Sequence, residues 1–291
     1  MRKIEFTKVV ASGNDFIIIN RVPFTACRLP NFAKRICDRK FGAGADGLLF
    51  LEKSKIADIR MRIFNADGSE AQMCGNGARC LALYYSRRST VNARRSKISL
   101  ETGAGIIEGR VAGNNVRIKL TEPRDYQAGV PIKINDREMK IHSINTGVPH
   151  AVIFVEGIEE IDVSSIGREI RYYEGFAPAG TNVDFVEIIS NDTIKVRTYE
   201  RGVEDETLAC GTGAAASAIA YSQQSTPAQA PACRTGRDAP TAQVHSPRQK
   251  INVITRGGET LKVYFKRENN EVSNVWLEGK ARIVYGGEYY V

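Results

Sequence analysis

Short apolar runs, several of them alternating apolar and polar residues, recur along the chain and predict a strand-rich protein. β-Branched residues dominate these runs, which suits the pleated surface of a half-buried sheet. Turn dipeptides at Ser190-Asn191 and Gly257-Gly258 predict two hairpins. The expected strands cover Ile4–Val10, Phe16–Asn20, Asp58–Phe64, Val116–Leu120, Ala151–Val155, Phe185–Ile189, Ile194–Thr198, Ile251–Thr255 and Leu261–Phe265.

Helical patterns are fewer, and the three best cover Leu29–Arg39, Ala78–Arg87 and Gly213–Tyr221. The last two each follow a glycine cluster, which marks a turn directly before the helix. The stretch Gln223–Gln249 is rich in Ser, Gln, Thr, Ala and Pro, and it predicts a long flexible loop. Strands and helices mixed in this way indicate an α/β (α+β) protein.

A repeated motif is the most informative feature of the sequence. Glu70–Ala78 aligns without gaps with Glu206–Ala214, and each copy has a Cys-Gly-x-Gly turn between an expected strand and a helical run. A second, weaker similarity pairs Asn14–Ile17 with Val183–Val186. Both similarities predict two related halves, which would place the two Cys-Gly-x-Gly turns opposite each other across a cleft.

The halves are expected to divide near Thr121-Glu122-Pro123, where a strand ends in a polar stretch with a proline. This gives an N-terminal half over residues 1–122 and a C-terminal half over 123–280, with the insertion at 223–249. Two domains suit a chain of 291 residues, and the 42% hydrophobic and 25% charged content is typical of a globular protein.

The chain has no apolar run near the roughly 20 residues of a membrane span, and its start lacks a signal-peptide pattern, so we expect a cytoplasmic protein without membrane partners. A homodimer is left open. The net charge of +8 is spread among acids and no nucleic-acid-binding motif occurs, so we expect no nucleic acid partner. In a reducing compartment the cysteines are free thiols. They are Cys27, Cys37, Cys74, Cys80, Cys210 and Cys233.

In each repeat a cysteine precedes a helix, so unpaired backbone N–H groups gather around its sulfur. This arrangement lowers a thiol pKa from about 8.5 toward neutrality and can also hold a carboxylate. Two such thiols facing one cleft suit removal and return of a proton on opposite faces of a carbon, which inverts a stereocentre without a cofactor. The alternative is that Cys74 and Cys210 are small buried residues at helix starts, and this stays the preferred interpretation for Cys27, Cys37 and Cys80.

At these residues the chain resembles the diaminopimelate epimerases, and the resemblance runs almost end to end. It implies epimerisation of LL-2,6-diaminopimelate to meso-diaminopimelate for lysine and peptidoglycan biosynthesis, without cofactor or metal. It also implies two pseudo-symmetric halves, each a mixed sheet wrapped around a central helix, with a last strand over about Ala281–Val291 returning to the first half. The matching segments are Gly13–Phe16, Phe64–Glu70, Met73–Gly77, Pro149-His150, Gly180–Phe185, Tyr199–Gly202 and Ala209–Gly213.

The resemblance assigns catalysis to Cys74 and Cys210, and modulation of the thiol pKa to His150 and Glu200. Two positions depart from the family pattern: Gly47 stands where some members have glutamine, and Val148 where an asparagine is frequent. In the family, the side chains at both positions are expected to contact the end of the substrate that does not react. The residues implied in substrate binding are Asn14, Asn65, Gly75, Asn76, Asn182, Glu200, Arg201, Gly211 and Thr212.

Other functions stay open on the sequence alone. The nearest is a proline or hydroxyproline racemase-like enzyme with the same two-cysteine chemistry, which the Tyr199–Gly202 segment disfavours. A zinc or redox protein is disfavoured because no Cys-x-x-Cys pair occurs. A non-catalytic binder of small molecules is a further alternative. Gly42–Gly47 fits a dinucleotide-binding pattern, but a helix is expected before it instead of a strand.

Overall fold

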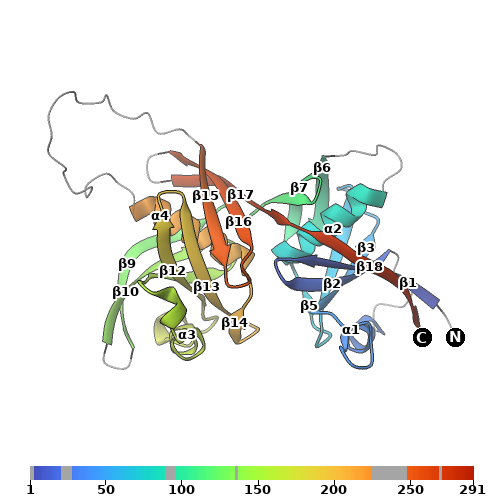
Figure 1. Cartoon of the computed structure of the whole chain (residues 1–291), viewed down its shortest axis with the longest axis horizontal. Helices are drawn as coiled ribbons and strands as arrows, with labels where there is room; N and C mark the ends of the chain where they lie inside the picture. The colour runs from blue at the N-terminus through green and yellow to red at the C-terminus, as the bar shows by residue number, and fades with distance from the viewer. Residues whose placement is uncertain (1–2, 21–27, 89–95, 135–136, 225–247, 269–270) are drawn as a thin grey trace.

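A computed structural model describes residues 3–20, 28–88, 96–134, 137–224, 248–268 and 271–291. Figure 1 shows two lobes side by side, one around helix α2 and the other around helix α4. The first lobe contains β1 (Lys3–Ala11), β2 (Asn14–Asn20), α1 (Leu29–Cys37), β3 (Gly47–Glu52), β4 (Ile59–Asn65), β5 (Glu70–Ala71), α2 (Gly75–Arg88), β6 (Lys97–Thr102), β7 (Gly105–Ala112) and β8 (Asn115–Lys119).

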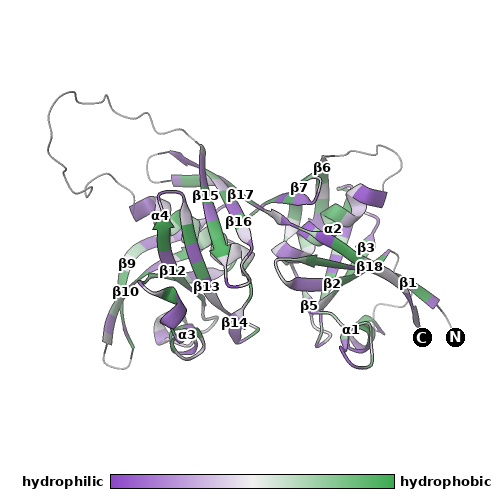
Figure 2. Ribbon diagram, in the orientation of Figure 1, coloured by the Kyte–Doolittle hydropathy of each residue, from purple (hydrophilic) through white to green (hydrophobic). Residues whose placement is uncertain are grey.

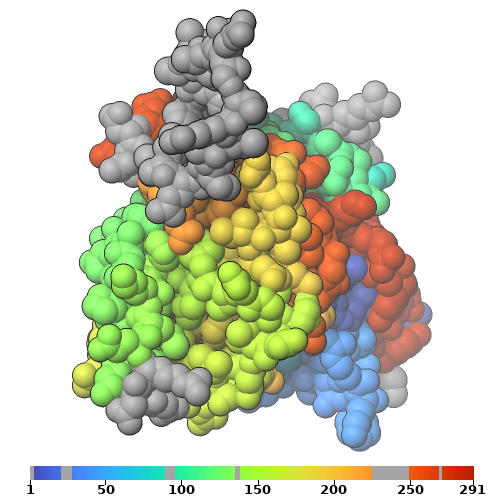
Figure 3. All heavy atoms as spheres, turned by 60° about the vertical axis from the view of Figure 1, so that its left-hand side comes forward, coloured from blue at the N-terminus to red at the C-terminus, as the bar shows by residue number. Residues whose placement is uncertain are grey.

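The second lobe repeats this order of elements. It contains β9 (Arg124–Ile134), β10 (Arg137–Asn145), β11 (Pro149–Phe154), α3 (Val163–Arg171), β12 (Asn182–Ser190), β13 (Thr193–Glu200), β14 (Asp205–Thr207), α4 (Gly211–Gln224), β15 (Arg248–Thr255), β16 (Thr260–Glu268) and β17 (Glu271–Lys280). The last strand, β18 (Arg282–Tyr290), pairs with β1. In the space-filling view its red atoms lie beside the blue N-terminal residues (Figure 3).

Strand pairing shows the same topology twice. A parallel pair joined through a helix, β2–β3 or β11–β12, is followed by an antiparallel partner and then by a short strand. The helix α2 or α4 comes next, and then a strand parallel to β4 or β13. The fold is therefore a mixed α+β fold of two pseudo-symmetric halves, each a mixed sheet with a central helix.

Apolar residues fill the space around the two central helices. Along the strands hydrophobic and hydrophilic stretches alternate (Figure 2), as in β16, whose residues are alternately buried and half-buried. One apolar cluster includes residues of both α2 and α4, while separate clusters lie under α1 and under α3. Each sheet therefore encloses a central helix on one face and is covered by a second helix on the other.

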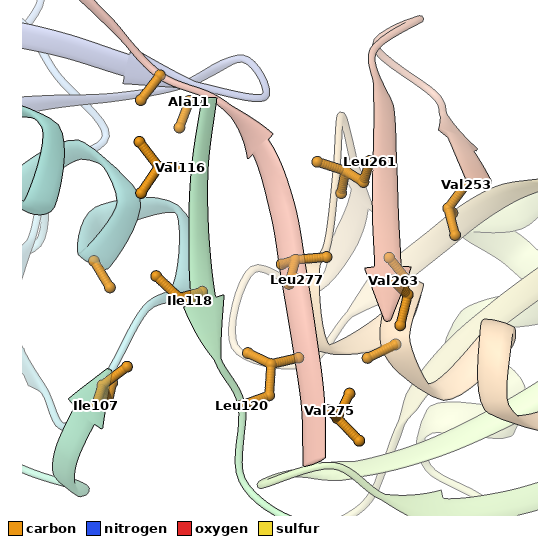
Figure 4. Close-up of a cluster of buried hydrophobic side chains, with 14 of the residues drawn as sticks. Ala11, Ile107, Val116, Ile118, Leu120, Val253, Leu261, Val263, Val275 and Leu277 are labelled. Carbon is orange, nitrogen blue, oxygen red and sulfur yellow. The ribbon is translucent and has the colours of Figure 1, made fainter. Parts of the chain in front are cut away.

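The two halves are joined by the antiparallel pairing of β8 with β17. Val116 and Ile118 of β8 and Leu277 of β17 lie in one buried cluster that continues to Leu261 and Val263 (Figure 4). Since apolar burial is the main favourable term in folding, this shared core fixes the halves against each other.

The two predicted hairpins and the three predicted helices are confirmed. The helix α3 and several strands, among them β9 and β10, were not predicted. The weaker similarity was wrong as an equivalence: Asn14–Ile17 opens β2, whose topological counterpart is β11, whereas Val183–Val186 lies in β12, the counterpart of β3. Residues 225–247 of the predicted loop lie outside the described residues, and the domain boundaries stay predictions.

Candidate active site

Cys74 lies between β5 and the first residue of α2, and its side chain is half-buried. Its Sγ lies 3.8 Å from Oδ1 of Asn14, at the start of β2. The N–H of Ala78 donates to the Cys74 carbonyl at 2.8 Å, and the N–H groups of Asn76 and Gly77 point at the sulfur and lower the thiol pKa. The predicted turn of backbone donors around the sulfur is therefore present.

Cys210 has the equivalent place before α4 and is buried. The N–H of Gly213 donates to its Sγ at 3.4 Å, and the hydroxyl of Thr212 lies 3.4 Å from the same sulfur. The N–H of Ala214 donates to the Cys210 carbonyl at 2.9 Å, as Ala78 does in the first half. The two thiols therefore share one local geometry.

Burial raises the pKa of both thiols, which corrects the expected shift toward neutrality. The backbone donors act in the predicted direction, but desolvation of a thiolate is the larger effect. The carboxylate of Glu200 raises the pKa of both thiols, and Asp184 raises that of Cys210 further. A sequence shows the helix start, whereas burial depends on the folded chain.

One hydrogen bond links the two repeated turns. The amide Nδ2 of Asn76, on α2, donates to the carbonyl of Ala209 at 3.5 Å, and Ala209 immediately precedes Cys210. The carboxylate of Glu200 acts electrostatically on both sulfurs and raises the pKa of each thiol, beyond the larger effect of burial. The structure therefore places Cys74, Cys210, Asn76 and Glu200 in one region between the halves.

His150 is fully buried and is paired with Asp184, its Nδ1 lying 2.7 Å from Oδ2 of the carboxylate. The other oxygen of Asp184 accepts from the hydroxyl of Thr198 at 2.7 Å. A Cβ at Gly213 would lie 2.2 Å from that oxygen, so glycine lets α4 begin directly against Asp184. His150 thus belongs to a buried group beneath Cys210, and it lowers the pKa of Glu200, which burial raises.

Asn182 uses both ends of its amide within the protein. Its Nδ2 donates to the Pro149 carbonyl at 3.0 Å, and its Oδ1 accepts from the N–H of Arg201 at 2.9 Å. Arg201 is a half-buried residue, and its Nη1 donates to the Ala179 carbonyl at 3.3 Å. Asn182 therefore holds the Arg201 backbone in place.

The remaining predicted residues differ in their surroundings. Asn14 donates to Asp46 at 2.8 Å besides its contact with Cys74, whereas Asn65 is exposed and donates to Ser69 at 2.9 Å. Gly75 and Gly211 are the first residues of α2 and α4, where backbone N–H groups lack helical partners. The carbonyl of Thr212 accepts from the Thr146 hydroxyl at 3.1 Å.

Strand register relates the two departures from the family pattern to residues of the opposite half. Phe64 pairs with Glu70 as Tyr199 pairs with Glu206, so these positions are equivalent. Continuing the register makes Gly47 the counterpart of Asn182, and Val148 the counterpart of Asn14. Asn182 therefore carries an amide in the second half where the first half has Gly47, and Asn14 carries one in the first half where the second half has Val148.

Sequence reasoning missed Asp184, Arg79, and two arginines that bind the repeated glutamates. Arg62 pairs with Glu70 and Arg197 with Glu206. The available signal was the repeated glutamate four residues before each cysteine. Among the described residues, no group of His, Cys, Asp or Glu could hold a metal ion, and no helix is long and apolar enough to cross a membrane.

Comparison with known proteins agrees with this geometry. Among solved structures, the fold is similar to a phenazine biosynthesis protein of the PhzF family from Bacillus anthracis, with a TM-score of 0.74 and 17% identity over all of both chains. It is also similar to a hydroxyproline epimerase from Agrobacterium vitis, with a TM-score of 0.68 and 13% identity over 99% of this chain and 91% of that one. At these identities the likeness concerns the fold alone.

Sequence relatives are more specific. The chain is 38% identical to the diaminopimelate epimerase of Aquifex aeolicus over 98% of this chain and 97% of that protein. It is 39% identical to the diaminopimelate epimerase of Hydrogenobaculum sp. over 97% and 96%. The family model of diaminopimelate epimerase matches residues 6–125 and 142–284. With the Cys-Gly-x-Gly turn present at the start of both central helices, the chain belongs to the diaminopimelate epimerase family.

Proposed function

We propose that this chain epimerises LL-2,6-diaminopimelate to meso-diaminopimelate, with Cys74 and Cys210 as the two acid–base groups. The observation that carries the proposal is the pair of equivalent thiols, each preceding a central helix, in two turns that the Asn76–Ala209 hydrogen bond links. Membership of the family supplies the substrate and the reaction, which feeds lysine biosynthesis. The enzyme is an isomerase that acts on a small molecule.

The reaction needs one thiolate and one thiol at a time. The thiolate takes the α-proton from one face, and the opposite thiol gives a proton to the other face, after which the protonation states of the pair are reversed. Burial raises the pKa of both thiols, so a thiolate formed there is a stronger base than an exposed one. The stronger base suits removal of a weakly acidic α-proton.

The substrate carboxylate at the reacting carbon would be held by the N–H groups of Gly75, Asn76, Gly211 and Thr212. Negative charge grows on this carboxylate as the α-proton leaves, and donors already in position stabilise it without reorganising. The two helix starts together act as one anion site. Backbone donors at two equivalent helices make this site nearly symmetric about the reacting carbon.

The distal end of diaminopimelate carries a second amino and a second carboxyl group, so it needs both acceptors and donors. Asn14 and Asn65 from the first half, and Glu200 and Arg201 from the second, would bind it, with Asn182 positioning Arg201. An arginine fork matches a carboxylate with two parallel hydrogen bonds. His150 and Glu200 would tune the thiol pKa values. No cofactor is required by this scheme.

We also propose the domain division on which the site depends. The first half would consist of residues 1–122 and the returning strand 281–291, and the second half of residues 123–280. The support is the repeated element order from β1 to β8 and from β10 to β17. Substrate would bind between these halves, in contact with both.

The test is incubation of reduced protein with LL-diaminopimelate in D2O, without added cofactor, following the meso product and deuterium at the α-carbon. Cys74→Ala and Cys210→Ala should each lower epimerisation by at least about 10³-fold. Cys37→Ala, at the end of α1, is the matched control and should keep activity. Absence of product and of deuterium in the wild type, or turnover of L-proline instead, would contradict the proposal.

A further inference from the structure

Arg79 is a fully buried arginine on α2, five residues after Cys74. Its guanidinium lies against β17, where residue 279 is glycine. A Cβ at Gly279 would lie 1.7 Å from Nη1, so no larger residue fits there while Arg79 keeps this position. The fold thus makes room for a cation inside the protein, next to the helix that begins at the first thiol.

The contacts of Arg79 are polar but uncharged. Its Nη2 donates to the Ser12 hydroxyl at 2.8 Å and to the side-chain oxygen of Asn76. Its Nε and Nη1 have no hydrogen-bond partner among the described residues. A buried charge without an ionic partner is costly, so an arginine kept here indicates a role that depends on its charge or on its fork.

Asn76 and Ser12 both lie at the proposed site. Asn76 contributes a backbone N–H to the anion site, and its amide reaches the Ala209 carbonyl beside Cys210. Ser12 lies in the turn between β1 and β2, two residues before Asn14, which contacts Cys74. One guanidinium therefore ties the start of α2 to the turn that carries Asn14.

Burial lowers the pKa of Arg79, and the charged and titratable groups that favour its charged form are Glu259, Cys80 and Cys74. Glu259 already accepts from the backbone N–H of Lys280 at 2.9 Å, and Cys80 is buried with its pKa raised. Of the three, Cys74 is the one that the reaction requires as an anion.

At the equivalent position of its central helix, the second half has no cation. The position equivalent to Arg79, five residues after Cys210, is Ala215. The carboxylates of Glu200 and Asp184 both raise the pKa of Cys210, whereas at Cys74 Glu200 raises the pKa and the charge of Arg79 lowers it by a smaller amount. The two thiols share a local turn but differ in the charges around them.

We propose that Arg79 is a positioning residue that holds Asn76 and Ser12 in place and supplies the buried positive charge favouring the thiolate at Cys74. When one thiol of the pair is ionised, Cys74 would then carry the negative charge in preference and Cys210 the transferable proton. Substrate of one configuration would meet the base on one face, and the opposite configuration would require the proton to move first.

The experiment measures alkylation of Cys74 and Cys210 separately, by mass spectrometry after pulses of iodoacetamide between pH 6 and 10. In Arg79→Gln the Cys74 profile should move up by about one pH unit, because a nearby positive charge is lost, while that of Cys210 stays. Arg79→Lys keeps the charge and should keep the Cys74 profile, but it should raise KM because the hydrogen bonds of Nη2 to Ser12 and Asn76 are lost.

Arg87→Gln, on the exposed end of α2, is the matched control and should change neither profile. If the Gln variant does not fold, Arg79→Met, which fills the space without a charge, takes its place. An unchanged Cys74 profile in the neutral variants, or an equal shift in Arg79→Lys, would overturn the proposal. The inference rests on the proposed two-thiol function. Alkylation needs no substrate, so it tests the effect of Arg79 on Cys74 even if the protein does not epimerise diaminopimelate.

Discussion

Arg197 and Glu206 form a two-point ion pair, with Nε and Nη2 of the arginine 2.7 and 2.8 Å from the two carboxylate oxygens. Arg62 and Glu70 form the same pair in the first half, with the same two distances. Each pair joins a long strand to the short strand that leads into a Cys-Gly-x-Gly turn. The repeated glutamate thus anchors the turn, and the two anchors are related by the pseudo-symmetry.

Loss of an anchor should destabilise the second half more than the first. Arg197 is 8% exposed and also donates to the carbonyls of Ile158 and Ile161, whereas Arg62 is 20% exposed. We expect Glu206→Gln to cost about 2 kcal/mol of unfolding free energy, and Glu70→Gln about 1 kcal/mol or less. Urea unfolding measures both, and equal losses would contradict the argument from burial.

Gly213→Ala should damage the Cys210 turn. The added Cβ would lie 2.2 Å from the Asp184 carboxylate, so either α4 or the His150–Asp184 pair must move. We expect a loss of about 2 kcal/mol or more in stability, together with a fall in kcat of about 100-fold. Gly75→Ala is the comparison, because its nearest neighbour, Ile118, is 3.5 Å away, and its stability should change little.

Removing the carboxylate of Glu200 should lower the pKa of both thiols at once. Glu200 raises the pKa of Cys74 and of Cys210, so Glu200→Gln should move the alkylation profiles of both to lower pH. Asp184→Asn should move that of Cys210 down and leave Cys74 unchanged. Unchanged alkylation profiles in Glu200→Gln, in a variant with a native circular dichroism spectrum, would show that this carboxylate does not control the pKa of the thiols.

Buried thiols also predict how stability depends on pH. Burial raises the pKa of Cys37 to about 12, above the value of 9.0 of a free thiol. The folded protein then holds a proton that the unfolded chain releases, so this contribution is complete below about pH 9 and is lost as pH rises toward 12. The slope is about 1.4 kcal/mol per pH unit for one thiol. Urea midpoints at pH 8 and 10.5 should differ less in Cys37→Ala than in the wild type.

The parts of the fold that local sequence specifies were predictable. The turns at Cys74 and Cys210 and the helices after them follow from glycine placement and from the repeat, and the structure confirms both. The pairing of β2 with β3 and of β11 with β12 joins segments separated by a helix, so the resemblance of Asp15 to Asp184 was a misleading guide to equivalence. Local residue types do not encode long-range register.

The electrostatics of the site were predictable only in part. Helix starts were visible in the sequence, and their N–H groups do lower the pKa of both thiols. Desolvation exceeds this effect, and it arises from residues far apart in the chain that close around the sulfurs. Arg79 gave no signal either, because an arginine on a helix is usually exposed. Its burial became apparent only with β17 and Gly279 in place.

Introducing an amide side chain should cost more stability at Gly47 than at Val148, the two departures from the family pattern. A Cβ at Gly47 would lie 3.0 Å from the Phe64 carbonyl and from the Phe16 ring, so Gly47→Gln should cost about 1–3 kcal/mol of stability. Val148 is half-buried and already carries a side chain, so Val148→Asn should cost less than about 1 kcal/mol. Val148 is the counterpart of Asn14, so the amide of an asparagine at position 148 would lie beside the Cys210 turn. We expect a changed KM for diaminopimelate and an unchanged alkylation profile of Cys74, and an altered profile would show that Val148 influences the thiol directly.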